Sequence, residues 1–350
     1  MKNTNIQWCH SSVNPVMGCD GCELWRSYGK LEADLAFHAD EAGIPKSITR
    51  QVLAARLAGH SLSDIVRARG TLLAAIQKDL AGNDDLRIRM ASVVKRASAC
   101  YAGNLHVLRA GHSGFADKFE RPKVFPGRMA LAARWQPPSA AEQAAKPWLS
   151  GARRLIFISD MGDALSRDVS FDFLRDEIIS AVTSLEGQRH IWLWVTKRPA
   201  RMAEFSSWLG ERDTCWPDNL VPMTTVTSMA NIVRVDQLRR IPARMRGLSC
   251  EPMWEPLHLD LDGIDWVIAG GGSDELAPPF NVEWALQLQG ACEVAGTAFF
   301  LKQLGRHPAW GGRALKLQDK HGGDWEEWEE SWRVREIPSG FKQCKGSQGT

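Results

Sequence analysis

Two closely spaced cysteines are the first residues in this sequence that could bind a metal. Cys19 and Cys22 enclose Asp-Gly in a CxxC sequence, and the glycines at 18 and 21 leave the backbone free to wrap. Zinc ions, iron–sulfur clusters and redox dithiols all use this spacing. Cys100 becomes a neighbour of the pair if the residues between them are an excursion from the main fold. The motif then consists of three cysteines, held by the loop after the first strand.

Polar residues at the ends of apolar runs form the second group of candidates. Six runs are short and nearly all apolar, which is typical of parallel strands buried on both faces. They span residues 154–160, 190–196, 220–227, 245–251, 265–271 and 297–303. The carboxyl ends of such strands meet at one edge, where ligands bind. The candidates at this edge for binding a cofactor are Ser159, Asp160, Lys197, Arg198, Thr227, Glu251, Gly270, Gly271, Gly272 and Lys302.

Each of these candidates also has a purely structural explanation. Lys197 and Arg198 can anchor a carboxylate or phosphate, or they can be the solvated start of a helix. Glu251 can bind ribose hydroxyls or a substrate amine, or it can form an ion pair at a strand end. The glycines at 270–272 can bring backbone close to a ligand, or they can form a tight turn. We take Lys197 and Glu251 as the candidate catalytic residues.

Helical patterns between the strands define the fold class. Ser170 is placed to cap a helix, Pro199 and Gly210 mark the start and end of a second, and Asn281 and Gly296 bracket a third. Alternating strands and helices predict an α/β fold with a parallel sheet. With a further strand near 5–9, the sheet is predicted to be a (β/α) barrel or partial barrel of about six to seven strands. An open doubly wound sheet is the alternative.

The sequence divides into a core and several accessory segments. We expect a barrel core over 1–29 and 97–304, a small helical insertion over 30–96, a Trp-rich C-terminal extension over 305–340 and a disordered tail over 341–350. Residues 134–150 have the composition of a linker or surface loop. In the extension, Trp325, Trp328 and Trp332 have the spacing of one face of a short amphipathic helix.

Composition restricts the class of protein. The chain has 350 residues, of which 44% are hydrophobic and 24% charged, as in ordinary globular proteins. A net charge of +2 gives no overall attraction to nucleic acids or membranes. No apolar stretch is long enough to span a membrane, and the N-terminus lacks the apolar core of a secretory signal. Eight cysteines are too few for a disulfide scaffold. We therefore expect a cytoplasmic protein, with no indication of its oligomeric state.

Several phrases of the sequence resemble a known family. NIQWCHSSVNPVMGCDGC at 5–22 and CYA at 100–102 are similar to the opening of an uncharacterised phage-associated family with a three-cysteine motif. FISDMGD, WVTKRPARM, LSCEPMWEPL, DWVIAGGGS, FFLKQLG and GGDWEEWEESWRVREIP continue the resemblance in the same order. The resemblance covers most of the chain outside 23–99. That family is in turn similar to the radical S-adenosylmethionine superfamily, whose members use a partial (β/α) barrel.

This resemblance implies an iron–sulfur enzyme. In the superfamily, three cysteines hold a [4Fe–4S] cluster whose fourth iron binds the amino and carboxylate groups of S-adenosyl-L-methionine. An electron donor then drives formation of a 5′-deoxyadenosyl radical. By resemblance, Cys19, Cys22 and Cys100 are the cluster ligands, and Cys9 is not. The compact CxxxCxxC of the superfamily is here a CxxC followed by a long gap. The phage association makes a nucleic acid or nucleotide the expected substrate.

Two alternative functions fit the same residues. In the first, Cys19, Cys22, Cys100 and one of His10, His106 or His112 hold a structural zinc ion, and the protein is not catalytic. In the second, the chain is a nucleic-acid-interacting protein of phage or mobile-element origin that uses the helices of 30–96. Iron and sulfide analysis distinguishes the enzyme from the zinc protein, and salt-sensitive DNA binding that depends on 30–96 identifies the third function.

Overall fold

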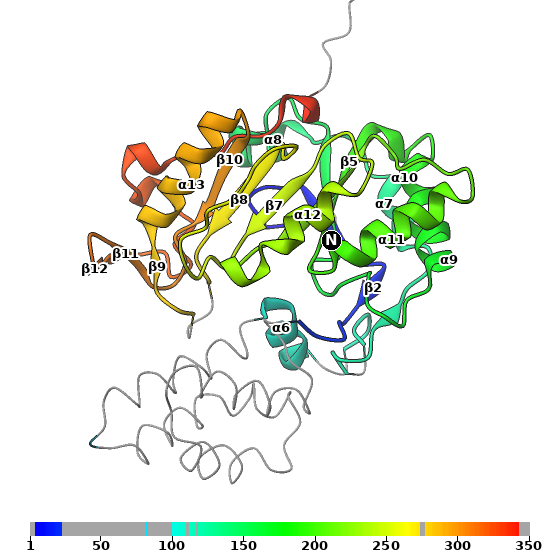
Figure 1. Ribbon diagram of the computed structural model, residues 1–350, viewed down its shortest axis with the longest axis horizontal. Coiled ribbons are helices and arrows are strands. Elements are labelled where there is room, and N and C mark those ends of the chain that lie inside the picture. The colour runs from blue at the N-terminus through cyan, green and yellow to red at the C-terminus, as the bar shows by residue number, and fades with distance from the viewer. Residues whose placement is uncertain are drawn as a thin grey trace, which may run out of the picture. The chain divides into compact units, whose positions relative to one another are not determined.

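A seven-stranded parallel sheet forms the main body of the protein. The computed structural model describes residues 4–22, 82, 100–109, 112–116, 118–273 and 277–342. The strand order is β1-β4-β5-β6-β7-β8-β10, and every neighbouring pair is parallel. The sheet curls through 201° as a half-barrel, with helices between its strands (Figure 1). The predicted partial (β/α) barrel is confirmed.

The six apolar runs each contain one strand of this sheet. The strands are β4 (Arg154–Ile158), β5 (His190–Thr196), β6 (Leu220–Thr225), β7 (Gly247–Cys250), β8 (Trp266–Gly270) and β10 (Ala298–Gln303). The first strand was predicted wrongly near 5–9, since β1 spans Ser11–Val13. The preceding segment is a loop because the Lys146 ammonium takes up three of its carbonyls, those of Thr4, Ile6 and Cys9.

Two compact units make up the chain. Unit 1 comprises 1–17, 123–273 and 279–350, and unit 2 comprises 18–122 and 274–278. In unit 2 the structure describes the loop that carries the CxxC sequence and helix α6 (Tyr101–Arg109). The predicted insertion at 30–96, apart from Gly82, lies outside the described residues. The predicted disordered tail began at 341, but Phe341 is buried and Lys342 bridges to Ala152, so that boundary was wrong; residues 343–350 lie outside the described residues.

Helices of unit 1 begin and end where local sequence signals place them. The Oγ of Ser170 accepts a hydrogen bond from the N–H of Phe173 and caps α9 (Phe171–Leu174), which continues through a π-helical turn, Arg175–Ile179, into α10 (Ser180–Thr183). Helix α11 spans Pro199–Gly210 as predicted. Asn281 caps α13 (Val282–Ala295), which ends at Gly296 with φ 69°. The remaining helices packed on the sheet are α7 (Arg128–Ala133) and α12 (Val233–Arg239).

Two predictions outside the sheet were wrong. The segment 134–150 is not simply a loop, because it contains α8 (Ala140–Ala145) and a 3-10 turn, Pro147–Leu149. The three spaced tryptophans do not share one helix: Trp325 and Trp332 lie in separate 3-10 turns, Trp325–Glu327 and Glu330–Trp332, and Trp328 lies between them. Their indoles have different partners, since Trp325 packs on Trp148 and Trp332 packs on Trp310.

Short elements complete unit 1. β2 (Val16–Met17) pairs with β3 (Lys123–Val124), and β9 (Phe280–Asn281), β11 (Pro308–Trp310) and β12 (Arg313–Ala314) form a three-stranded sheet. Further 3-10 turns are Gly187–Arg189, Met229–Asn231 and Ser339–Phe341. Among the described residues, no helix has the length and apolar character needed to cross a membrane.

The two faces of the large sheet bury different sets of side chains. Ile156, Trp192 and Val267 point to the face that the helices cover. Leu155, Ile191 and Trp266 point to the opposite, inner face, which packs on Trp8 near the N-terminus and on Phe341 near the C-terminus. Such alternation is what buries both faces of a parallel sheet and explains why the strands are apolar throughout.

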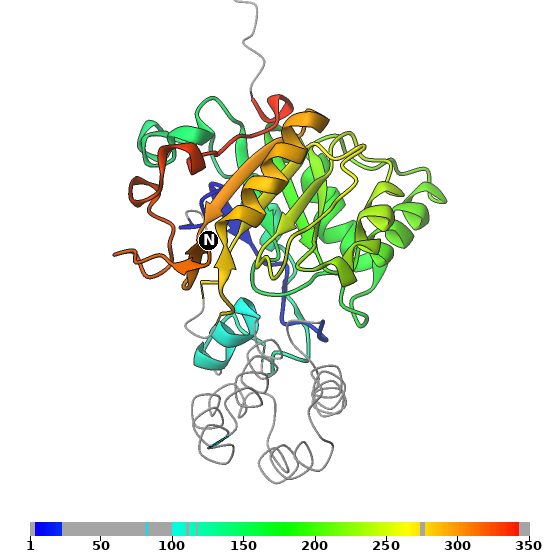
Figure 2. The ribbon, with the colours of Figure 1, turned by 60° about the vertical axis from the view of Figure 1, so that its left-hand side comes forward.

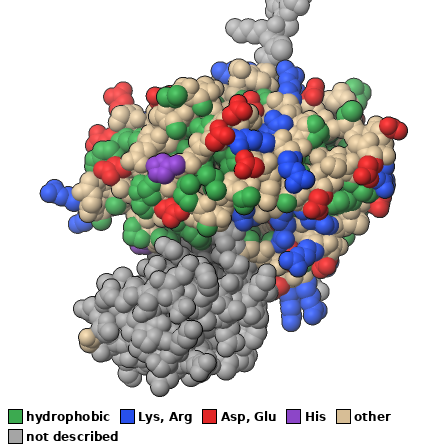
Figure 3. All heavy atoms as spheres, viewed as in Figure 1, with side chains coloured by type: hydrophobic (Ala, Val, Ile, Leu, Met, Phe, Trp, Pro, Cys, Tyr) green, Lys and Arg blue, Asp and Glu red, His purple; other side chains and the backbone are tan. Residues whose placement is uncertain are grey.

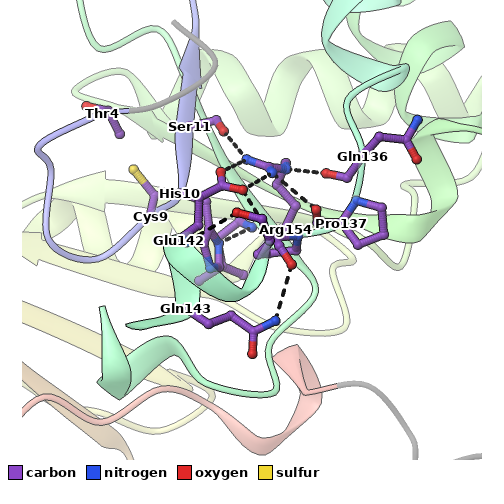
Figure 4. A network of polar contacts seen from close by, with 12 residues as sticks. Thr4, Cys9, His10, Ser11, Gln136, Pro137, Glu142, Gln143 and Arg154 are labelled. Carbon is purple, nitrogen blue, oxygen red and sulfur yellow. Dashed lines mark hydrogen bonds and ion pairs between the residues drawn. The ribbon is translucent and has the colours of Figure 1, made fainter. Parts of the chain in front are cut away.

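A buried polar network fastens the segment before β4 to the sheet. Arg154, 1% exposed, pairs with Glu142 at 2.8 Å and donates to the Ser11 hydroxyl and to the carbonyls of Gln136 and Pro137 (Figure 4). Burial raises the pKa of Glu142, but the hydrogen bonds from Arg154 and Ser139 outweigh it and lower that pKa to about 2. A buried guanidinium is tolerated here because its donors are satisfied.

Candidate functional site

The inner face of the half-barrel changes from apolar to polar toward the carboxyl ends of its strands. Alternate residues of a strand share a face, so Thr225 lies on the same face as Met223, which belongs to the inner core. Thr225 is the direct cross-strand partner of Ser249 on β7. Lys302 lies at an irregularity of β10 between Leu301 and Gln303, and its ion pair with Glu251 joins it to this edge. These polar side chains therefore stand above an apolar floor at the edge where ligands bind in parallel (β/α) sheets.

Glu251 and Lys302, from neighbouring parts of this edge, are brought together by an ion pair. The Lys302 ammonium donates to Oε1 of Glu251 at 2.5 Å, and the Gln303 amide donates to the same oxygen at 3.0 Å. The Gln303 amide also donates to the carbonyl of Gly271. Both charged side chains are largely buried, with exposed fractions of 16% for Glu251 and 18% for Lys302. The structure thus brings two sequence-predicted site residues into direct contact, and Gln303, which was not predicted, binds the same carboxylate.

Ser159 and Asp160, at the end of β4, form a second polar group together with Asn14. Ser159 has φ 72°, a left-handed conformation that side chains other than glycine rarely adopt. Its hydroxyl is buried and has no hydrogen-bond partner among the residues that the structure describes. Burial raises the pKa of Asp160, although hydrogen bonds from Asn14 and Ser12 oppose that shift. A strained residue with an unsatisfied buried hydroxyl is a feature that functional sites often contain.

Lys197 and Arg198 lie beside an acid that the sequence analysis missed. The Asp163 carboxylate accepts hydrogen bonds from the Thr196 hydroxyl at 2.9 and 3.0 Å and from the backbone N–H of Lys197 at 3.2 Å. The Arg198 guanidinium lies 3.9 Å from the same carboxylate. Asp163 stands three residues after Asp160 in the sequence DMGD. A second acid so close to a predicted site residue could have identified Asp163 as a further candidate. Asp163 fixes the start of α11, where both basic residues lie.

The glycines after β8 pack closely against the end of β10. A Cβ on Gly271 would meet the Leu304 carbonyl oxygen at 2.5 Å and the Phe280 side chain at 2.8 Å. A Cβ on Gly270 would lie 3.0 Å from the Gln303 carbonyl oxygen. The Gly272 carbonyl accepts a hydrogen bond from the backbone N–H of Arg306. These contacts by themselves explain why the chain has glycine at 270 and 271.

Thr227, the remaining strand-end candidate, is held within the loops that follow β6 and β7. Its hydroxyl donates to Oδ1 of Asn231 at 3.3 Å, and its carbonyl accepts from the N–H of Trp254. Asn231 in turn accepts from Arg234, a residue on α12. The side chain of Thr227 is fully buried, so its described contacts link two loops at the carboxyl edge of the sheet.

The three candidate cysteines lie in unit 2. Cys19 is buried, and Cys22 and Cys100 are half-buried. Gly18 has φ 92°, and a Cβ there would lie 2.5 Å from the Phe119 carbonyl oxygen, which accepts the N–H of Cys19. Cys100 precedes α6, and its sulfur accepts the N–H of Gly103 at 3.4 Å. Glycine is therefore required at position 18 for the CxxC loop to pass close to Phe119.

A metal centre needs both suitable donor atoms and side chains that converge on one point. Three thiols are the donor set of a cluster with one open iron position. In the described part of the chain, however, no three His, Cys, Asp or Glu side chains are arranged so that they could hold a metal ion. The three thiols are thus the right kind of donor for an iron–sulfur cluster, but the described residues do not bring three such donors together as metal ligands.

Four other cysteines and three histidines that the structure describes have identifiable surroundings. Burial raises the pKa of Cys9 to about 12, so this thiol stays protonated inside the inner core. Cys250 and Cys292 are buried, whereas Cys215 is exposed. His10 accepts the N–H of Leu155. His106 packs on the rings of Phe115 and Phe119, and His112 contacts the carbonyl of Arg109.

Comparisons with known proteins place the chain in a family. A search of the curated proteins and a search of the solved structures each found no match. Residues 91–332, more than half of the chain, match the family DUF5131, which is described as a protein of unknown function. This segment includes Cys100 and the sheet from β4 to β10, together with every strand-end candidate. The chain therefore belongs to the DUF5131 family.

Proposed function

We propose that this protein is a radical S-adenosylmethionine-like iron–sulfur enzyme. The observation that carries the proposal is the parallel half-barrel, whose inner face ends in a polar rim. This rim contains a largely buried Glu251–Lys302 pair and a Ser159 hydroxyl that has no hydrogen-bond partner among the described residues. The three-cysteine sequence supplies the thiol donors. A partial barrel of this kind is the fold that the resemblance implies.

Cys19, Cys22 and Cys100 would hold the [4Fe–4S] cluster. The N–H of Gly103 donates to the Cys100 sulfur, and a hydrogen bond of this kind favours the thiolate form that metal binding requires. Because ligands are deprotonated and gathered when a metal binds, binding free energy contributes to folding free energy. The proposal therefore expects unit 2 to gain stability when the cluster assembles.

The rim residues would bind S-adenosyl-L-methionine. With an electron from an external donor, this cofactor supplies a 5′-deoxyadenosyl radical. Asp160 and the Ser159 hydroxyl can accept hydrogen bonds from an amino group, and Glu251 can accept from hydroxyls. Lys197, Arg198 and Lys302 are the cations suited to a carboxylate. We further propose a nucleic acid or nucleotide as substrate and the cytoplasm, where thiols stay reduced, as the place of action.

Anaerobic reconstitution with iron and sulfide tests the proposal. The wild-type chain should bind iron and sulfide in equal amounts, and Cys19→Ser, Cys22→Ser and Cys100→Ser should each lose most of both. Cys215→Ser is the matched control, because this cysteine is exposed and lies outside the motif. Adding S-adenosylmethionine should change the electron paramagnetic resonance signal of the reduced cluster. Zinc without sulfide, or equal iron binding by all variants, would disprove the cluster.

A further inference from the structure

A projecting β-hairpin in unit 1 carries an exposed aromatic ring beside several Lys and Arg side chains. β11 and β12 are joined by Gly311 and Gly312, with φ 57° and 73°. A two-residue turn with positive φ at both positions needs glycine or a similar residue and gives a tight hairpin. The hairpin lies at the left edge of the molecule in Figures 1 and 2.

Trp310 and Arg313 flank this turn and face the same side of the hairpin. They are direct cross-strand partners, and such partners in an antiparallel pair share a face. Trp310 is 38% exposed, while its ring is supported by Trp332 at a centroid distance of 5.1 Å. The hairpin thus presents a braced indole next to a guanidinium.

The segment around the hairpin is locally basic. Residues 306–321 contain four Lys or Arg and a single acid, Asp319. Arg313, Lys316 and Lys320 are exposed, and Arg306 is half-buried. With the part of the chain that the structure describes, none of these four forms an ion pair. Figure 3 shows Lys and Arg side chains projecting at this edge.

Two acids of this region, Asp319 and Glu327, bind backbone N–H groups. The Asp319 carboxylate accepts the backbone N–H groups of His321, Gly323 and Asp324, which lower its pKa against the opposing effect of burial. The Glu327 carboxylate accepts the N–H groups of Gln318 and Asp319. Within the described residues, neither carboxylate forms an ion pair with the four cations of the hairpin segment.

We infer that this hairpin, residues 306–320, binds single-stranded nucleic acid. Exposed aromatic rings stack on unpaired bases, and neighbouring Lys and Arg neutralise phosphates. The two-stranded ribbon carries both groups on a rigid support, which limits the entropy lost on binding. The idea that the hairpin holds the enzyme's substrate rests on the function proposed above. Binding of nucleic acid by the hairpin does not itself require the iron–sulfur cluster.

Fluorescence polarisation with a labelled oligothymidylate of about 20 nucleotides tests the inference. The wild-type chain should bind, more weakly as salt rises from about 50 to 200 mM. Trp310→Ala should weaken binding at least about tenfold, and Trp310→Phe should restore most of it. Arg313→Glu with Lys316→Glu should lower the salt dependence by about one unit of logarithmic slope.

Arg189→Glu is the matched control for charge reversal. Arg189 is exposed, and no ion pair involving it is found in the described ranges. This variant should bind the oligonucleotide like the wild type. Equal loss in Arg189→Glu and the hairpin variants, unchanged binding by Trp310→Ala, or tighter binding to duplex DNA would overturn the inference. The same measurements in a Cys19→Ser background separate this result from failure of the cluster.

Discussion

The side-chain amide of Asn14 donates a hydrogen bond to Oδ1 of Asp160 at 2.5 Å, although the two residues are 146 positions apart. The Oδ1 of the same Asn14 accepts the backbone N–H of Met161 at 2.9 Å. One amide therefore joins the end of β1 to the strained turn after β4. It also holds the buried Asp160 carboxyl in place beside the Ser159 hydroxyl.

Replacing Asn14 by Asp should make stability depend on pH. The substitution keeps the oxygen that accepts the Met161 N–H but places a second carboxylate against Asp160. Two adjacent carboxylates cannot both ionise without cost, which raises the pKa of the pair in the folded state. We expect the free energy of unfolding to fall by about 2 kcal/mol or more at pH 8 and to recover toward pH 5, measured by urea denaturation. Asn14→Ala, which lacks the new charge, should lose a similar amount at both pH values. If Asn14→Asp lowered the free energy of unfolding no more at pH 8 than at pH 5, the predicted repulsion between the two carboxylates would be contradicted.

His10 should contribute to acid destabilisation. It is buried, accepts the N–H of Leu155 at 3.0 Å, and burial together with the charge of Arg154 lowers its pKa to about 4. The unfolded chain then binds more protons, so the stability is present above pH 6.5 and is lost as the pH falls toward 4. His10→Asn keeps an acceptor without titrating, and it should reduce that loss by about 2–3 kcal/mol. Thermal unfolding at pH 7 and 4.5 measures the difference. An unchanged pH dependence would mean that His10 is not the titrating group.

Arg335 should be poorly replaced by lysine. It is 7% exposed, donates to the carbonyls of Lys302 and Gly323 at 3.1 and 3.0 Å, and lies over the rings of Trp148 and Trp325 at 4.2 and 4.7 Å. Burial lowers its pKa to about 10. A lysine cannot reproduce the planar fork or the stacking, so Arg335→Lys should destabilise the fold by about 2–4 kcal/mol. Chemical denaturation gives the value, and a cost below about 0.5 kcal/mol would refute the role assigned to Arg335.

Glu251 and Lys302 should be energetically coupled. Each is largely buried, so losing one partner leaves the other charge poorly compensated. Glu251→Gln and Lys302→Met should each destabilise the fold, while the double variant should lose less than the two together. A coupling energy of about 1–3 kcal/mol is expected from a double-mutant cycle. Additive effects would show that the pair is held without mutual stabilisation.

Local signals in the sequence predicted some elements well. Helix α11 spans Pro199–Gly210 as expected, because proline at the first position and glycine at the end act within one turn. The strand edges were also located, since fully buried parallel strands are apolar until they leave the sheet. β1 was misplaced because Ser11 and Ser12 are buried through contacts with distant residues such as Arg154. No local pattern marks such a strand.

The sequence by itself determined a parallel α/β fold and the polar edge, because periodicity is a property of short segments. The choice of Cys19, Cys22 and Cys100 as candidate cluster ligands came from the CxxC spacing together with the family resemblance. Only the tertiary structure decided which edge residues meet. The pairing of Glu251 with Lys302, of Asn14 with Asp160 and of Asp163 with Thr196 depends on the register between strands, which contacts across the whole sheet determine. The order of the strands in the sheet decides which strand ends lie next to each other, and no short segment of the sequence contains that order.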